Sequence, residues 1–199
     1  LQLLEVLGLK ALEIPTDPRT GLSIEALDLA TRTGRIAACL LVPNASNPLG
    51  SIMPDEHKKR LAKLTAERGV AVIEDDIYGE LFFGQTPPRP IKAFDQVGNV
   101  MLCSSFSKCL SPALRIGFVA AGRYRQQIAL HKTVSSGSTN PITQLVLAEY
   151  LESGSYDRHM RGLRRAYEHQ VDAMRAAVAR HFPPATRLTQ PLGGFVLWV

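Results

Sequence analysis

Short apolar runs alternate with segments of helical periodicity along the first part of the chain. Two segments have helical spacing: 23–33 begins with a serine suited to an N-cap, and 54–68 begins with proline and ends before a glycine. The alternation predicts an α/β fold with a mainly parallel sheet flanked by helices. Five apolar runs have the length of buried strands, at residues 11–14, 36–42, 70–74, 100–103 and 116–121.

The pattern changes after residue 123, where three helical stretches follow one another at about 123–134, 141–153 and 155–181. The pair Pro183-Pro184 then precedes a final apolar strand at 193–199. We expect residues 1–182, including a connecting helix at 155–181, to form part of a large domain. Residues 183–199 are expected to begin a small C-terminal domain. The chain opens in mid-pattern and closes on an apolar strand, so we expect it to be an internal fragment.

Composition and charge agree with an ordinary soluble domain. The chain has 199 residues, of which 45% are hydrophobic and 21% charged, and its formal net charge is +5. Six arginines between 155 and 181 lie opposite an apolar stripe, which favours a solvated face over a nucleic-acid surface. The odd number of cysteines and the absence of any apolar stretch of roughly 18 residues predict reduced thiols in a cytoplasmic protein that does not enter a membrane.

Several common signatures are absent or incomplete. Gly117 and Gly122 have the spacing of a P-loop, but the lysine and the Ser/Thr that contact phosphate and Mg²⁺ are missing. The chain contains no GxSxG, GxGxxG or HExxH motif, and its five histidines lack metal-ligand spacing. Hydrolase, dinucleotide-binding and zinc-site interpretations therefore have little support, and we expect no metal.

Four polar segments lie at or near the ends of predicted strands, where open α/β sheets bind their ligands. Each has an ordinary interpretation by itself, as a turn, a strand end, a loop or a surface cation. In chain order they are Asn47-Pro-Leu-Gly50, Glu74-Asp-Asp-Ile-Tyr78, Ser104-Ser-Phe-Ser-Lys108 and Leu114-Arg-Ile-Gly117.

Taken together and in this order, the four segments resemble the cofactor site of fold type I pyridoxal-phosphate aminotransferases of class I/II. The closing Pro-x-Gly-Gly-Phe-x-Leu-Trp is similar to the first strand of that family's small domain, so the resemblance covers nearly the whole chain. The stretches around Asp75 and Lys108 are most similar to the aminotransferase-like domain of MocR-type regulators in the GntR family. Those proteins join an N-terminal winged helix-turn-helix to this domain.

The resemblance implies that Lys108 forms a Schiff base with pyridoxal 5′-phosphate, which acts as an electron sink when a bond to the substrate Cα breaks. It assigns Asp75 to the carboxylate that keeps the pyridine nitrogen protonated. Glu74 and Asp76 are expected to point elsewhere if the strand alternates. Lys108, Asp75 and Tyr78 are the expected catalytic residues.

Further residues match the family's cofactor contacts. Asn47 and Tyr78 are expected to hydrogen-bond the phenolic oxygen of the cofactor. Ser105, Ser107 and the fork-shaped guanidinium of Arg115 are expected to hold its phosphate. The family's phosphate-capping loop and ring-stacking aromatic would precede residue 1, and its substrate-carboxylate arginine would follow Val199. The substrate amine therefore stays unassigned.

Three functions are compatible with these residues. The favoured one is the effector domain of a MocR/GntR-type regulator, in which cofactor or its adduct with an amino acid or other small amine changes DNA binding by a winged helix-turn-helix outside this chain. The alternative is a free-standing aminotransferase that moves an amino group between an amino acid and a 2-oxo acid. A relic without cofactor is disfavoured because all the site residues are present. The resemblance also implies a homodimer.

Overall fold

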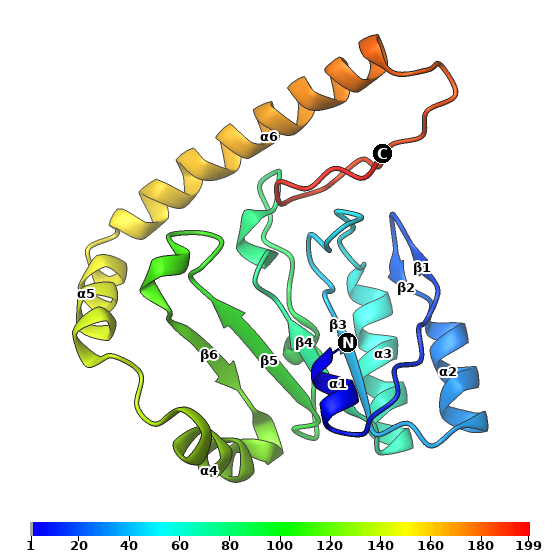
Figure 1. Ribbon diagram of the computed structural model, residues 1–199, viewed down its shortest axis with the longest axis vertical. Helices are drawn as coiled ribbons and strands as arrows, with labels where there is room; N and C mark the ends of the chain where they lie inside the picture. Colours follow the sequence, from blue (N-terminus) through cyan, green and yellow to red (C-terminus); the bar gives the residue numbers. More distant parts are fainter. Residues whose placement is uncertain (1) are drawn as a thin grey trace.

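The computed structural model describes residues 2–199 and is built around one four-stranded sheet (Figure 1). Its strands are β3 (Ala38–Leu41), β4 (Ala71–Asp75), β5 (Val100–Ser105) and β6 (Gly117–Ala120), in that spatial order. β3, β4 and β5 are parallel to one another, and β6 pairs antiparallel to β5. The expected α/β fold with a mainly parallel sheet is confirmed.

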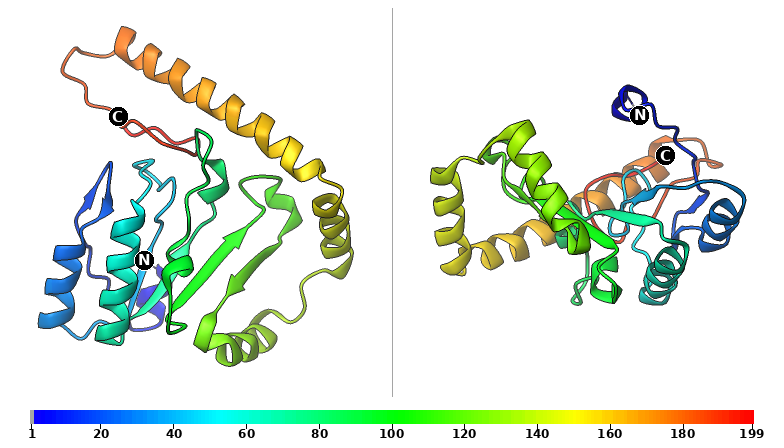
Figure 2. Two further views of the ribbon diagram at one scale, coloured as in Figure 1. Left: turned by 180° about the vertical axis from the view of Figure 1, so that it is seen from behind. Right: turned by 90° about the horizontal axis from the view of Figure 1, so that it is seen from below.

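Two helices, α2 (Ile24–Thr33) and α3 (Asp55–Arg68), cover one face of this sheet, as the view from below shows (Figure 2). Both helices begin and end where their capping residues predict. The Ser23 hydroxyl accepts the N–H of Ala26, and Gly69 ends α3 with a φ of 65°. The main core fills the space between these helices and the sheet, and it contains Ile24, Leu27, Cys39, Leu41, Met53, Leu61, Ala62, Val70, Val72, Ile91 and Val100.

The second half of the chain is helical. After the short η4 turn (Gly122–Tyr124) come α4 (Arg125–Ser136), α5 (Pro141–Glu152) and the 27-residue α6 (Ser155–His181). α6 rises diagonally above the upper edge of the sheet in Figure 1. Three 3₁₀ turns, η1 (Gly79–Leu81), η2 (Ile91–Phe94) and η3 (Pro112–Leu114), lie in the connections between strands.

The predicted first strand at 11–14 is wrong. Residues 9–15 follow the short helix α1 (Gln2–Val6) without entering a sheet, and Leu12 is 60% exposed. A two-stranded hairpin of β1 (Thr16–Asp17) and β2 (Gly21–Leu22) comes next. The apolar run has the composition of a strand but no neighbouring strand, and a strand forms only where its backbone groups find a ladder partner.

The predicted final strand at 193–199 is also wrong. The segment contacts loops instead of a ladder: the N–H of Gly194 donates to the carbonyl of Leu81. The preceding Leu192 donates its N–H to the carbonyl of Gly50, and its own carbonyl accepts from the N–H of Phe83. A single antiparallel bridge joins Phe82 to Gly193. The closing segment thus lies across the loops that follow β3 and β4.

The structure bears on the expected reduced thiols and on the expectation that the chain does not enter a membrane. Cys39, Cys103 and Cys109 are free thiols. Within residues 2–199, no helix is both long and apolar enough to cross a membrane.

Candidate functional site

The polar segments singled out in the sequence meet at one edge of the sheet. Parallel strands end on the same side, so the residues that follow β3, β4 and β5 lie together, and β6 begins there because it runs in the opposite direction. This is the upper edge of the sheet in Figure 1. It carries all seven predicted site residues: Asn47, Asp75, Tyr78, Ser105, Ser107, Lys108 and Arg115.

Asp75 is the last residue of β4 and lies opposite Cys103 of β5 in the strand register. Burial raises the pKa of its carboxyl group above the usual value, and a hydrogen bond from the N–H of Ile77 opposes this shift. Within residues 2–199 its carboxylate forms no ion pair. A half-buried carboxylate without a cation is suited to receive a positively charged group from a ligand.

Asn47 and Tyr78 approach each other from different loops. The Asn47 amide Nδ2 lies 3.4 Å from the Tyr78 hydroxyl oxygen, and the Asn47–Pro48 peptide bond is cis. Tyr78 is buried, whereas Asn47 is exposed. The amide N–H and the phenolic O–H therefore form a pair of donors at the ends of β3 and β4.

Ser105, Ser107 and Arg115 come together where β5 turns toward β6. Ser105 is paired with Gly117, and the N–H of Ser107 donates to the Ser105 hydroxyl at 3.4 Å. Arg115 stands just before β6 with a φ of 52°, and its exposed guanidinium makes no hydrogen bond or ion pair with the described residues. Two hydroxyls and an unpaired guanidinium are the groups that a phosphate dianion requires.

Gly117 allows these two strands to lie close together. A Cβ atom added at Gly117 would lie 2.7 Å from the carbonyl oxygen of Ser104 and 3.1 Å from the Cβ of Ser105. No side chain fits at that distance, so glycine is required for the approach of β6 to Ser105.

Lys108 lies in the tight turn that follows β5. The N–H groups of Leu110 and Ser111 both donate to the carbonyl of Phe106, which closes the turn around it. The Lys108 side chain is exposed, and its amine has no hydrogen-bond partner among the residues that the structure describes. The amine is thus available to an external carbonyl group.

The two other carboxylates of the acidic triplet point away from Asp75. The Glu74 carboxylate is fully buried on the helical side and accepts the N–H groups of Ile91 and Lys92 at 2.6 and 2.8 Å. Asp76 accepts the side-chain amide of Asn44 at 2.8 Å. Burial raises the pKa of Glu74 to about 7 and that of Asp76 to about 6.

A buried polar network beneath the site was missed in the sequence. The fully buried Lys58 of α3 donates to the Asn44 side chain at 2.7 Å and to the carbonyl of Arg89 at 2.6 Å, and Asn44 in turn donates to Asp76. The network joins the loop of Asn47 to the loop of Asp75. One signal was present: Lys58 occupies the same helical stripe as Leu61 and Thr65, which are buried.

The groups at this edge fit pyridoxal phosphate. Pyridoxal phosphate carries an aldehyde, a basic ring nitrogen, a phenolic oxygen and a phosphate. The sheet edge offers a matching group for each of them: an amine, an unpaired carboxylate, a pair of donors and a cluster suited to phosphate. They come from three strand ends and the start of a fourth strand, so chance grouping of surface residues does not account for them.

Comparison with known proteins decides the family. The family model described as aminotransferase class I and II matches residues 2–199. The chain belongs to this family. The expected membership, and with it the fold type I architecture, is therefore confirmed.

Relatives of this aminotransferase-family chain include both regulators and enzymes. The uncharacterized HTH-type transcriptional regulator YjiR of Escherichia coli is 42% identical over the whole chain, which corresponds to 42% of that protein. The aromatic-amino-acid aminotransferase 1 of Thermococcus litoralis is 31% identical over 94% of the chain and 46% of the enzyme. The chain thus spans less than half the length of these curated relatives.

A solved structure shows the same fold with a bound cofactor derivative. LysN, an α-aminoadipate aminotransferase of Thermus thermophilus complexed with N-(5′-phosphopyridoxyl)-L-leucine, matches with a TM-score of 0.85 at 32% identity. The match covers 94% of this chain and 49% of that one. Its compound is a phosphopyridoxyl adduct of an amino acid, the kind of ligand for which the edge residues of this chain are suited.

Proposed function

We propose that this chain is the pyridoxal-phosphate-binding effector domain of a MocR/GntR-type transcriptional regulator, with Lys108 as the covalent attachment point. The observation that carries the proposal is the gathering of Lys108, Asp75 and the Ser105 to Arg115 cluster at one sheet edge. The regulator reading is supported by the 42% identity to an HTH-type regulator over the whole chain.

Each side chain has a separate task in this proposal. The Asp75 carboxylate holds a proton on the ring nitrogen through charge pairing, and its partial burial strengthens that pairing. Asn47 and Tyr78 orient the ring through its phenolic oxygen. Ser105, Ser107 and Arg115 bind the phosphate and fix the distance between ring and Lys108.

The bound cofactor supplies an electron-withdrawing ring next to an amine linkage, which is the chemistry shared by aminotransferases and amine sensors of this family. The Lys108 amine would hold the aldehyde carbon of the cofactor, and once released from it the amine would accept or deliver a proton at the Cα of a bound amine. The incoming compound is proposed to be an amino acid or another small amine.

Further parts of the proposal concern the complete protein. Residues 1–182 are proposed to belong to the large domain and residues 183–199 to the start of the small domain. The complete protein is proposed to be a cytoplasmic homodimer that contacts DNA only through a separate winged helix-turn-helix. A free-standing aminotransferase is the second candidate, and the 31% identity to the Thermococcus litoralis enzyme supports it.

The test is a DNA-binding titration of the full-length protein with and without pyridoxal phosphate and amine at one fixed salt concentration. We expect cofactor, or cofactor with amine, to change the affinity for DNA, because a ligand shifts a conformational equilibrium through its differential affinity for two states. Borohydride reduction and peptide mass mapping should place the cofactor on Lys108.

Two variants make this experiment specific. Lys108→Ala should abolish the response and leave basal DNA binding intact, whereas Lys132→Ala, which removes the amine of a distant lysine on α4, should preserve both. Identical isotherms in all conditions, together with steady multiple-turnover transamination, would favour the enzyme. A label on a lysine other than Lys108 would refute the proposed attachment point.

A further inference from the structure

The first turns of α6 contact residues one or two positions after two of the proposed cofactor residues. Cys109 is the neighbour of Lys108, and Glu80 lies two positions after Tyr78. Tyr156 of α6 contacts both of them: its hydroxyl donates to the Glu80 carboxylate and lies 3.4 Å from the Cys109 sulfur. α6 therefore contacts both the residue that follows Lys108 and a residue that follows Tyr78.

His159 adds a hydrogen bond to the backbone beside Lys108. Its Nε2 atom lies 2.8 Å from the carbonyl oxygen of Cys109. A carbonyl oxygen can only accept, so the imidazole donates through Nε2–H, and this donor is present in both the neutral ring with that tautomer and the protonated ring. His159 thus holds the main chain of the turn, not only a side chain.

Further side chains of α6 contact the residues around Lys108 and Tyr78. Tyr156 is 8% exposed, and its ring packs edge-on against Phe106, the residue two positions before Lys108. Arg164, about two turns after Tyr156 along α6, donates to the carbonyl of Glu80 at 3.1 Å. The turn from Phe106 to Cys109 is therefore bound to α6 on both sides of Lys108.

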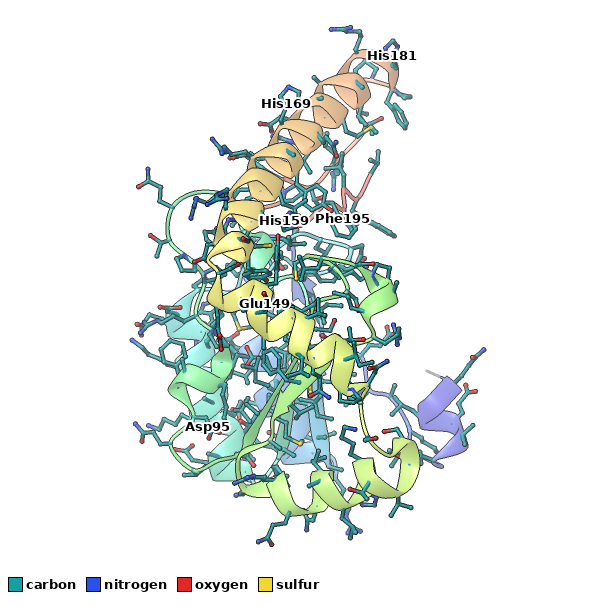
Figure 3. The ribbon with its side chains drawn as sticks, turned by 90° about the vertical axis from the view of Figure 1, so that its left-hand side faces the viewer. Asp95, Glu149, His159, His169, His181 and Phe195 are labelled. Atoms are coloured by element: carbon teal, nitrogen blue, oxygen red, sulfur yellow. The ribbon has the colours of Figure 1, made fainter. Side chains whose placement is uncertain are left out.

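The same helix approaches Tyr78 through a second route. The ring of Phe195 in the closing segment lies edge-on to Tyr78 at 5.8 Å and is tilted against Tyr167 of α6 at 5.2 Å. Figure 3 labels His159 on the lower half of the long helix, with His169 and His181 farther up, and Phe195 of the closing segment beside the helix. α6 is thereby linked to the Tyr78 side of the site as well.

We propose that Tyr156 and His159 are positioning residues that hold the Lys108 turn in register with α6, so that the direction of the Lys108 amine follows the position of this helix. The proposal rests on the function proposed for Lys108. It assigns these two side chains the task of transmitting a change at the cofactor into a movement of α6, and a movement of α6 back to the cofactor.

The turn is short enough for this transmission. The N–H groups of Leu110 and Ser111 both donate to the carbonyl of Phe106, so two main-chain hydrogen bonds close the turn that contains Lys108 and Cys109. Loss of the His159 hydrogen bond should therefore loosen Lys108 itself, and the loss of one neutral hydrogen bond shifts a local opening equilibrium about fivefold.

The experiment measures how often the turn that contains Lys108 opens in the full-length protein without cofactor, by hydrogen exchange and mass spectrometry. The variants are His159→Leu, which keeps volume but has no donor, His159→Gln, whose amide N–H can replace Nε2–H, and Tyr156→Phe. Hydrogen exchange of the Leu110 and Ser111 N–H groups, which close this turn on the carbonyl of Phe106, should become about fivefold faster in His159→Leu. We expect a value close to wild type in His159→Gln.

A second readout uses the cofactor-loaded protein. The midpoint of the pH-dependent change in its visible absorption reports the surroundings of the Lys108 linkage, and it should shift in His159→Leu and Tyr156→Phe but return in His159→Gln. The matched control is His169→Leu, the same substitution at an exposed position of the same helix. This control should change neither readout.

The outcomes separate the two proposals. If hydrogen exchange at the Lys108 turn and the absorption midpoint are the same in His159→Leu, Tyr156→Phe and His169→Leu, the positioning role is overturned, even if melting temperatures fall. If His159→Leu does not fold, His159→Asn, which keeps a polar group but cannot reach Cys109, takes its place. A wild-type protein without cofactor on Lys108 overturns the proposed function, while the hydrogen-exchange measurement still decides the positioning role.

Discussion

Asp75 and Asp76 are consecutive carboxyl groups with different surroundings. Asp75 ends β4 and has no cation near it among the described residues, whereas Asp76 accepts the Asn44 amide that Lys58 holds in place. Burial raises the pKa of both groups, and that of Asp76 reaches about 6. The first carboxylate is free to pair with a ligand, and the second is already used by the fold.

The role of the Asp75 charge can be tested by replacing one carboxylate oxygen with an amide nitrogen. Asp75→Asn keeps the shape of the site but removes the charge that would hold a proton on the ring nitrogen. We expect pyridoxal phosphate to remain attached at Lys108, while single-turnover amino transfer from an added amine slows by roughly 100-fold or more. Stopped-flow absorbance of the full-length variant measures this rate.

The control is the neighbouring substitution Asp76→Asn, which retains an oxygen acceptor for Asn44. It should leave the transfer rate within a few-fold of wild type. An equal loss in both variants, or a normal rate in Asp75→Asn, would contradict the assignment of Asp75.

At the scale of residues, the sequence predicts the motif positions well and the supporting network poorly. Asn47, Asp75, Lys108 and Arg115 stand at strand ends, and strand ends can be located from local apolar runs. The contact of Lys58 with Asn44 joins residues in different elements, and no local pattern specifies which buried lysine meets which amide. The contacts of Tyr156 and His159 with Cys109 span even longer separations and were missed for the same reason.

At the scale of elements, helices with capping residues in the sequence were predicted correctly, and two of the predicted strands were not. α2 and α3 were predicted correctly because Ser23, Pro54 and Gly69 mark their ends within one turn. The strands at 11–14 and 193–199 were wrong because a strand depends on a neighbour that the local sequence does not show. Leu192 and Gly194 instead form backbone hydrogen bonds with the loops after β3 and β4.

The docking of this closing segment can be tested with a pair of glycine substitutions. A Cβ added at Gly193 would lie 2.8 Å from the carbonyl oxygen of Leu81 and 2.9 Å from the Cα of Phe82. Gly193→Ala should therefore lower the free energy of unfolding by about 1–3 kcal/mol, the usual cost of overpacking. Urea denaturation of the full-length protein gives this value.

Gly162→Ala is the matched control, since a Cβ at this position on α6 meets no atom within 4 Å. It should leave stability unchanged or raise it by up to about 1 kcal/mol, because alanine favours a helix over glycine. Equal effects of the two substitutions would show that the closing segment does not pack as described.

At the scale of the whole molecule, the surface of α4 and α5 is unusually apolar. Large hydrophobic side chains on these helices are mostly exposed, and they include Leu130, Val134, Ile142, Leu145 and Val146. Surfaces of this kind mark contacts with other parts of a protein or with a partner.

We therefore expect the full-length protein to sediment as a homodimer. Burial of apolar surface between two copies stabilises the association in proportion to the area removed from water. Analytical ultracentrifugation with and without pyridoxal phosphate measures the state. A monodisperse monomer that retains the complete response of DNA binding to amine would contradict this expectation.

The length of α6 gives the contact beside Lys108 a mechanical meaning. A helix rises about 1.5 Å per residue, so the 27 residues of α6 form a rod about 40 Å long. Tyr156 and His159 lie near one end, and Phe182 follows the other end. A pivot of about 5° at the Lys108 end carries the far end through about 3.5 Å, as for any rigid rod of that length. In the proposed positioning role, α6 would pivot at the turn beside Lys108, so that a sub-ångström adjustment of this turn would become a displacement of about 3.5 Å at the far end of the helix.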